Sequence, residues 1–303
     1  MLTRYTQKNL TWIDLVAPNP EEVRSLMHEF GFSPALAQEL LSVSTKSKIE
    51  RYDDTLYAVL HFPVLRGKEM LRTTQEVDLI IGKNYLITTR FENIVSISNF
   101  AKAFEVDTVL GREGQYIHGG HLFAALMRNL YRALLLECDT IHTGLEELEE
   151  QLFDGREKDM VLEISEIGRI IYDFRQALSP HEEMLSSLEA PIERMFGREF
   201  GYYMRGVLGE YERVRDLTNH LRESMVEIRE TNNSLLSAKQ NEVMKNFSVL
   251  AFVFVPISLI MGLYQMNLPN TPFAGRIDFW VVLSFIVTLS LTFYIYFKRK
   301  GWL

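Results

Sequence analysis

The sequence predicts an α/β domain in its N-terminal part, long helices after it, and a two-helix membrane hairpin at its C-terminal end. Three observations predict this arrangement. Strand-like runs alternate with capped helices before residue 118, and Leu-rich segments of helical period follow up to residue 246. Two apolar runs without a charged residue, 247–264 and 279–297, each approach the ~20 residues that a helix needs to cross a bilayer core.

Residues 1–118 are expected to fold as one α/β domain. TWIDL at 11–15 has the composition of a strand, and the segments 48–65 and 76–91 each predict a β-hairpin, because strand-like runs flank a turn. The first hairpin turns near Asp54 and the second at 82–84, where the sequence is Gly-Lys-Asn.

Two short helices of this domain carry start and stop signals. Asn19 is a favourable N-cap, Glu22 lies three residues later as in a capping box, and Gly31 is placed to end the helix. Ser33, followed by Pro34, starts the next helix in the same way. Both helices therefore lie between the first strand and the first hairpin.

An acidic pair of antiparallel helices is expected over 119–200. The segments 121–153 and 158–190 are Leu-rich and helical in period, and Ser179-Pro180 predicts an irregularity in the second. The span 137–166 holds eleven Asp or Glu residues and only two basic ones. These carboxylates form either a solvated helical face or a local store or sensor of divalent cations, which bind through oxygen ligands.

A single stalk helix is expected over 201–246, continuing without a break into the first membrane span. Apolar residues recur there at spacings of four, three and seven, as in a heptad seam. The seam residues are Val207, Tyr211, Val214, Leu221, Met225, Ile228 and Leu235, with Thr218 and Asn232 at the skipped positions. A helix this long must bury its seam against copies of itself or against the other helices.

The segment 247–303 is expected to form the membrane hairpin, with spans at about 247–264 and 279–297. Lys245 precedes the first span and a basic run at 298–300 follows the second, so the positive-inside rule places both ends in the cytoplasm. Two buried core helices are the alternative interpretation. The net charge of −8 makes a nucleic-acid partner unexpected, and the single cysteine, Cys138, excludes an intramolecular disulfide.

The loop that follows the first span is polar where the chain leaves the bilayer. It reads MGLYQMNLPN, with Gln265 and Asn267 at the turn. If the first span faces a symmetry axis, Asn267 becomes a ring of neutral amide oxygens, which suit a hydrated Mg²⁺. The alternative is that Asn267 only ends the helix.

The run NEVMKNFSVLAFVFVPISLIMGLYQMNLP, at 241–269, resembles the first span and signature of CorA-type divalent cation channels. The family pattern is Asn-x-x-Met-Lys, a span with an internal Pro, and Tyr-Gly-Met-Asn, and the basic tail KRKGWL also fits. The resemblance extends over the whole architecture. It implies a funnel-shaped homopentamer in the inner (plasma) membrane that passes Mg²⁺, and often Co²⁺ or Ni²⁺. It implies no cofactor; Mg²⁺ is the substrate and a regulatory ligand.

The resemblance also assigns roles to residues of this chain. Asn267 forms the entrance ring, supported by Met266 and Tyr264, and Asn241 forms a polar ring at the cytoplasmic end of the pore. The residues expected to line the pore between them, with a hydrophobic constriction at the first two, are Met244, Phe247 and Ser258. The residues expected to bind regulatory metal on the lower stalk are Glu223, Glu227 and Glu230, which otherwise only flank the seam.

One residue departs from the family signature. Gln265 stands where the family has Gly, which adds a Cβ and a second amide at the pore mouth. This change leaves two alternatives open. The first is a channel that prefers Zn²⁺ or Co²⁺, as in the ZntB-like branch. The second is a membrane scaffold or signalling protein that does not conduct ions. An enzyme is not expected, because the Gly-rich segment around His118 and His121 lacks the Gly-Lys-Ser/Thr of a phosphate-binding loop.

Overall fold

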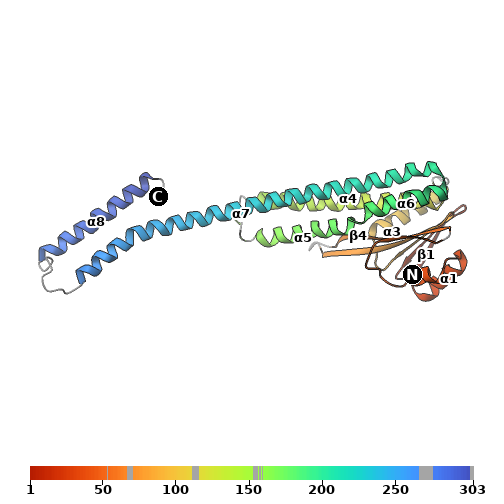
Figure 1. Ribbon diagram of the computed structural model, residues 1–303, viewed down its shortest axis with the longest axis horizontal. Coiled ribbons are helices and arrows are strands. Elements are labelled where there is room, and N and C mark those ends of the chain that lie inside the picture. Colours follow the sequence, from red (N-terminus) through yellow and green to blue (C-terminus); the bar gives the residue numbers. More distant parts are fainter. Residues whose placement is uncertain are drawn as a thin grey trace. The chain divides into compact units, whose positions relative to one another are not determined.

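A computed structural model describes residues 1–52, 54–66, 71–110, 116–152, 156, 158, 160–265 and 276–300 (Figure 1). The chain separates into two compact units, Met1–Arg229 and Glu230–Leu303. The expected boundaries after residues 118 and 200 therefore separate elements inside one unit. The expected boundary after residue 246 falls within a continuous helix, because no helix-breaking residue interrupts the sequence there.

The first unit contains a six-stranded sheet in the order β1-β2-β6-β5-β4-β3. The strands are β1 (Leu2–Gln7), β2 (Leu10–Val16), β3 (Lys48–Tyr52), β4 (Thr55–Arg66), β5 (Leu71–Ile81) and β6 (Tyr85–Arg90). The two predicted hairpins are confirmed as the antiparallel pairs β3–β4 and β5–β6. β2 and β6 pair in parallel, and β1, which was not predicted, pairs with β2 at the edge.

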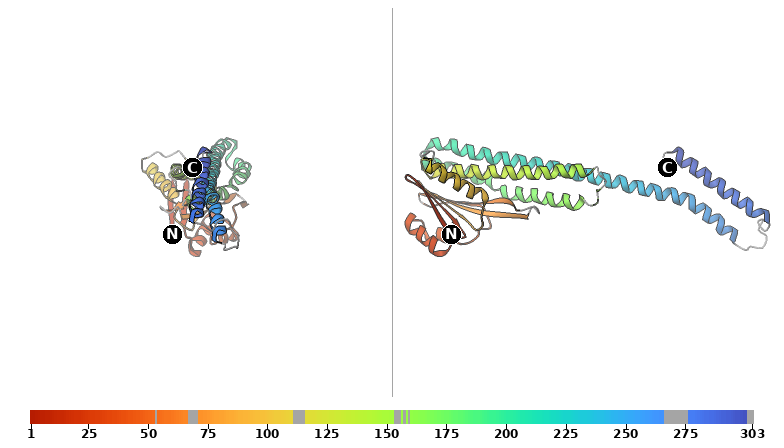
Figure 2. Two further views of the ribbon diagram at one scale, coloured as in Figure 1. Left: turned by 90° about the vertical axis from the view of Figure 1, so that its left-hand side faces the viewer. Right: turned by 180° about the vertical axis from the view of Figure 1, so that it is seen from behind.

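The sheet buries both of its faces. Ile13, Tyr57 and Val59 pack toward α1 (Pro20–Phe30) and α2 (Pro34–Glu39) on one face. The opposite face carries Trp12, whose ring lies 5.4 Å from that of Phe100 in α3 (Val95–Val109). Figures 1 and 2 show α1 and α3 on opposite sides of the strands. The alternation follows from the two-residue period of a strand.

The predicted helix signals are confirmed. The Asn19 side chain accepts hydrogen bonds from the amides of Glu21 and Glu22, at 3.0 and 2.8 Å, and Glu22 accepts one from the Asn19 amide at 3.1 Å. Gly31 closes α1 with a positive φ of 71°, which glycine adopts without steric cost. Ser33 caps α2 through the Leu36 amide at 3.3 Å.

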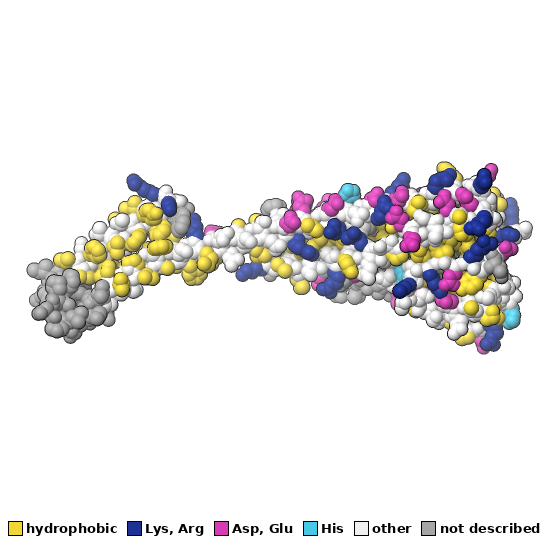
Figure 3. All heavy atoms as spheres, viewed as in Figure 1, with side chains coloured by type: hydrophobic (Ala, Val, Ile, Leu, Met, Phe, Trp, Pro, Cys, Tyr) yellow, Lys and Arg dark blue, Asp and Glu magenta, His cyan; other side chains and the backbone are white. Residues whose placement is uncertain are grey.

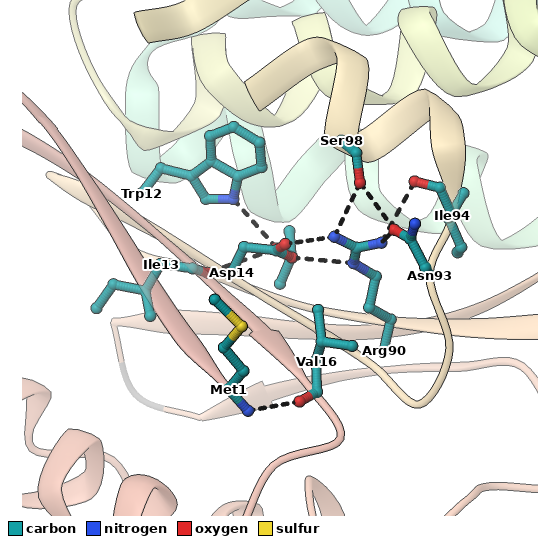
Figure 4. Close-up of polar contacts among 10 residues, drawn as sticks. Met1, Trp12, Ile13, Asp14, Val16, Arg90, Asn93, Ile94 and Ser98 are labelled. Carbon is teal, nitrogen blue, oxygen red and sulfur yellow. Dashed lines mark hydrogen bonds and ion pairs between the residues drawn. The ribbon is translucent and has the colours of Figure 1, made fainter. Parts of the chain in front are cut away.

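A buried ion pair holds the parallel strands together (Figure 4). The Arg90 guanidinium on β6 lies 2.7 Å from the Asp14 carboxylate on β2, and both side chains are 5% exposed. Thr88 donates to Asp14 at 2.7 Å, and the Trp12 indole donates to Thr88 at 3.1 Å. A second Arg90 nitrogen donates to Asn93 at 2.7 Å, so the charges are paired and hydrogen-bonded, as burial requires.

The predicted pair of helices over 119–200 is three helices in the structure. They are α4 (Gly119–Leu152), α5 (Met160–Leu178) and α6 (His181–Phe196), followed by the short 3₁₀ helix η1 (Arg198–Phe200). α5 ends at Leu178 because Pro180 has no amide hydrogen with which to continue the ladder. The irregularity predicted at Ser179-Pro180 is therefore a complete break between two helices.

The predicted stalk and first span form one helix, α7 (Gly201–Gln265). Its seam is buried within the chain, from Val207 at 0% exposure to Ile228 at 5%. The Tyr211 ring lies 5.7 Å from the Tyr131 ring of α4, and Thr218 lies 3.7 Å from Cys138 of α4. Of the two partners left open by the sequence, the other helices of the same chain cover this part of the seam.

Candidate functional site

Among the described residues, two helices are long and apolar enough to cross a membrane: the C-terminal part of α7, and α8 (Arg276–Arg299). They contact each other through Phe252 and Phe297, whose ring centroids are 6.0 Å apart. Val249 and Phe297 are buried at 7% and 4% exposure. Figure 3 shows hydrophobic side chains over the visible face of this pair and basic side chains near the C-terminal end of α8.

One face of α7 is packed on α8 and the opposite face is free of it. Val249 marks the packed face, and Val253 and Pro256 on the same side are half-buried. Ser258 lies nine residues after Val249, which at about 100° per residue turns it about 180° away. Phe247 lies about 160° from Val249 by the same geometry. Both residues are exposed, Phe247 at 64%.

The other candidate pore residues lie on or beside this free face. Met244 is 59% exposed and about 140° from Val249 around the helix axis. Asn241 is exposed one turn earlier and lies at the edge of the face, about 80° from Val249 on the same side as Met244. The structure therefore brings Met244, Phe247 and Ser258 onto one side of α7, with Asn241 at its edge, and their roles in a pore stay predictions.

The candidate entrance ring is only partly within the described chain. Tyr264 and Gln265 form the last helical residues of α7. Met266 and Asn267 lie outside the described residues, as does most of the loop that joins the two helices. The roles of these four residues stay predictions from the sequence.

The three candidate regulatory glutamates lie exposed on α7. Glu223, Glu227 and Glu230 flank the buried seam residues and face away from the packing of the same chain. Glu223 lies 3.7 Å from the His220 ring nitrogen, and both side chains are more than 70% exposed. Any metal bound at these carboxylates needs further oxygen ligands from outside this helix face.

The acidic region over 137–166 contains one carboxyl that differs from the rest. Glu137 accepts a hydrogen bond from the Leu65 amide of β4 at 3.1 Å, and burial raises the pKa of Glu137 to about 7. Most of the other acidic residues there are exposed. Across the described ranges, no three His, Cys, Asp or Glu side chains are grouped as metal ligands. A solvated helical face accounts for most of this region.

His118 and His121 have a structural role at the start of α4. The His118 carbonyl accepts from the His121 amide at 3.0 Å, which begins the helix. Their rings lie 4.0 Å apart, and the His118 ring stacks on Phe196 at 4.3 Å. Burial lowers the pKa of His118 to about 4, so the ring is neutral at physiological pH. The pair is part of an aromatic cluster.

The α/β unit followed by two helices that are able to cross a bilayer fits the class of integral membrane proteins. The family model for the CorA-like Mg²⁺ transporter protein matches residues 7–299. The chain therefore belongs to the CorA-like Mg²⁺ transporter family.

Relatives and solved structures agree with this assignment. The cobalt/magnesium transport protein CorA of Thermotoga maritima is 24% identical over 298 residues, covering 97% of this chain and 83% of that protein. The complete structure of the CorA magnesium transporter from Methanocaldococcus jannaschii superposes with a TM-score of 0.85 at 22% identity, covering 99% and 93% of the two chains. The ZntB cytoplasmic domain from Vibrio parahaemolyticus gives a TM-score of 0.62 at 13% identity, covering 76% and 88%.

Proposed function

We propose that this chain assembles as a homopentamer whose α7 helices line a pore for hydrated divalent cations, with Mg²⁺ as the preferred ion and Co²⁺ and Ni²⁺ as further substrates. The observation that carries the proposal is the free face of α7, which holds Met244, Phe247 and Ser258 opposite the face packed on α8. A single chain with two spans cannot enclose a pore, whereas a ring of such faces can.

The chemistry of this face supports passage of an ion that keeps its water. Ser258 offers a hydroxyl, and Asn267 is assigned the entrance ring, where neutral amide oxygens contact the water shell without holding the ion. Phe247 and Met244 form the hydrophobic constriction near the cytoplasmic end, which closes by bulk and dewetting. The carboxylates of Glu223, Glu227 and Glu230 are the candidate regulatory metal ligands.

The proposed location is the inner (plasma) membrane with both termini in the cytoplasm. Lys298 and Arg299 at the end of α8, and Lys245 before the first span, support this orientation. Lys298 lies 5.8 Å from the Tyr294 ring, which suits the boundary between lipid and water. Membrane lipid is then the partner of the remaining apolar surface.

A Zn²⁺ transporter of the ZntB-like branch is the second candidate. Gln265 in place of the signature Gly favours it, together with the structural likeness to the ZntB cytoplasmic domain. A third candidate, a scaffold with the CorA fold that does not conduct, rests on the same Gln265. Gln265→Gly separates the first two candidates, because it should raise Mg²⁺ flux if Gln265 changes selectivity.

Ion flux into proteoliposomes tests the proposal. Uptake of Mg²⁺, Co²⁺, Ni²⁺ and Zn²⁺ is measured with the wild type and with Asn267→Ala, which should abolish conduction. Phe247→Ala should increase flux by widening the constriction, whereas the matched variant Phe252→Ala, on the face toward α8, should not. Absence of flux for all four ions would contradict the channel and favour the third candidate, the scaffold that does not conduct. Equal effects of the two Phe variants would show that the free face of α7 does not line the pore.

A further inference from the structure

Two acidic side chains are buried side by side on β5. Glu76 is 6% exposed and Asp78 is 1% exposed, and both belong to the sheet face that α1 and α2 cover. Opposite them on β4 lie His61 and Val59, which pair with Glu76 and Asp78 respectively. Within the described part of the chain, neither Asp78 oxygen has a hydrogen-bond partner, and Glu76 Oε1 has none either. Two carboxyl groups buried this close together need either a positive charge beside them or a proton that neutralises one of them.

A proton is the compensation that the surroundings favour. Ionising a buried carboxyl without a partner is costly, and two adjacent buried carboxyls cannot both ionise cheaply. Burial raises the pKa of Asp78 to about 9, and the charge of Glu76 adds to the shift. Among the described residues no three metal-ligating side chains are grouped. Asp78 therefore holds a proton at neutral pH.

His61 connects this pair to a loop and to a groove open to solvent. Its Nε2 lies 3.5 Å from Glu76 Oε2 and donates to the Ser44 carbonyl at 2.9 Å. Its Nδ1 lies 2.9 Å from the Ser47 hydroxyl, which can donate to a neutral ring or accept from a charged one. The Ser44 amide donates to Glu76 at 2.7 Å. Loop 44–47 is therefore held by Glu76, which neighbours Asp78 on β5, and by His61.

The remaining charged and titratable neighbours are few. The Tyr57 hydroxyl lies beside Asp78 and partly offsets the rise in the pKa of Asp78. Glu39, which pairs with Lys48 at 2.9 Å, adds to that rise. A groove of about 520 Å³ beside His61 is lined by Lys46, Asp173 and neutral residues. The hydrogen bond to Glu76 is the main cause of the raised pKa of His61. The groove gives protons access to the His61 ring.

A chain of contacts leads from His61 to α7. The His61 carbonyl accepts from His181 Nε2 at 3.0 Å, so Nδ1 of His181 is the acceptor for the Tyr131 hydroxyl at 2.9 Å. The Tyr131 ring packs on the Tyr211 ring of α7 at 5.7 Å. All of these residues lie in the unit Met1–Arg229. A displacement of β4 at His61 thus reaches the helix that continues into the first span.

We propose that Glu76, Asp78 and His61 form a proton-binding site through which cytoplasmic pH regulates ion transport by this chain. The transport consequence rests on the proposed function above, whereas the site itself does not. As the pH rises, the proton leaves Asp78, and its carboxylate then faces Glu76 under loop 44–47. The resulting repulsion weakens the hold of Glu76 and His61 on Ser44 and Ser47, and shifts β4 relative to His181.

Infrared spectroscopy of the full-length protein in detergent tests the site without any transport. A protonated-carboxyl C=O band should remain above about pH 8, where Glu137 with its pKa of about 7 is ionised, and should titrate away with an apparent pKa near that of Asp78, about 9. Asp78→Asn, a neutral isostere of the protonated acid, should remove the band. Asp54→Asn, a change at an exposed carboxylate of the same sheet, should leave it. Absence of the band in the wild type, or its persistence in Asp78→Asn, overturns the proposal.

Transport across a pH series tests the regulation. Mg²⁺ or Co²⁺ uptake into proteoliposomes should change between pH 7 and pH 9 by up to about tenfold per pH unit, the limit for one linked proton. Asp78→Asn should remove this change, and Asp54→Asn should keep it. Equal pH responses in the wild type and Asp78→Asn overturn the regulatory role. If no ion is transported at all, the proposed function fails, and the infrared titration still decides whether the proton site exists.

Discussion

The two halves of α7 both carry large apolar side chains, but these side chains lie in opposite environments. Before Arg229 the side chains of the seam are buried, with Tyr211 and Leu221 each 2% exposed. After residue 243 they are largely open, with Phe247 at 64% and Leu250 at 51%. The first half finds its partners within the chain. Among the described residues, the second half packs on α8 along one side. In our proposal its other partners are lipid, water and further copies of the chain.

The comparison shows that apolar content alone does not tell where a helix is buried. In the first half, charged residues such as Glu223 and Arg222 alternate with the seam, which restricts burial to one stripe. In the second half, no charge interrupts 247–264, which is the pattern of a helix surrounded by apolar material. Substitutions in the first unit should therefore change its folding stability, and substitutions in the span should change transport.

The largest stability effect is expected at the ion pair between Asp14 and Arg90. Arg90→Met leaves a buried carboxylate without its counter-charge, which should lower the free energy of unfolding by about 3–5 kcal/mol. Asp14→Leu combined with Arg90→Met should recover part of this loss, because no charge remains buried. Unfolding is followed in urea by the fluorescence of the buried Trp12, in full-length protein with Trp280 and Trp302 replaced by Phe.

An exposed ion pair of the same unit is the control. Arg4 lies 2.6 Å from Glu29, but both side chains are more than 40% exposed. Arg4→Met should therefore cost less than about 1 kcal/mol of unfolding free energy. Similar losses for Arg4→Met and Arg90→Met would contradict the view that burial gives the Asp14–Arg90 pair its importance.

Two leucines of α7 compare the two halves of the helix directly. Leu221→Ala should lower the free energy of unfolding of the first unit by about 2–5 kcal/mol, because it leaves a cavity in packed surroundings. Leu250→Ala should leave that quantity within about 0.5 kcal/mol, because Leu250 does not belong to that unit. The same Trp12 assay measures both. A loss of similar size for Leu250→Ala would show that the two halves fold as one cooperative body.

Much of the local structure could be predicted because its signals are local. The cap at Asn19, the stop at Gly31 and the turn at 82–84 each depend on a few neighbouring residues. β1 and α3 were missed because they lack such signals; α3 begins after Ile94 with no side-chain cap. The parallel pairing of β2 with β6 joins residues more than 70 positions apart, as in the bond between Thr88 and Asp14. No local pattern indicates that pairing.

The candidate pore residues came from the family resemblance and not from a local pattern. The structure adds that Met244, Phe247 and Ser258 lie on the face of α7 opposite α8, and their roles stay predictions. The sequence did not indicate the buried pair Glu76 and Asp78, because charged residues on a strand usually predict a solvated face. Their burial depends on α1, α2 and loop 44–47, which only tertiary packing places there.

A stability effect that is smaller per pH unit than those above, and that varies with pH, is expected at His181 in the first unit. His181 is 0% exposed, and burial lowers its pKa to about 3. An unfolded histidine has a pKa of about 6.5, so below this value the unfolded state binds a proton that the folded state excludes. The stability that His181 contributes is complete above pH 6.5. It falls by about 1.4 kcal/mol per pH unit as the pH drops toward 3.

His181→Gln removes this proton uptake while its amide can still donate to the His61 carbonyl and accept from Tyr131. Between pH 6 and pH 4 the free energy of unfolding of the variant should fall less steeply with decreasing pH than that of the wild type. The difference between the two slopes corresponds to about one bound proton. His220→Gln, at an exposed position of α7, should keep the wild-type slope because water solvates that ring in both states. Parallel slopes for the wild type and His181→Gln would mean that a charged His181 is accommodated in the folded unit. The contacts of His181 with β4 and Tyr131 would then accommodate its protonation. The packing between the sheet and α7 would be looser than the distances indicate.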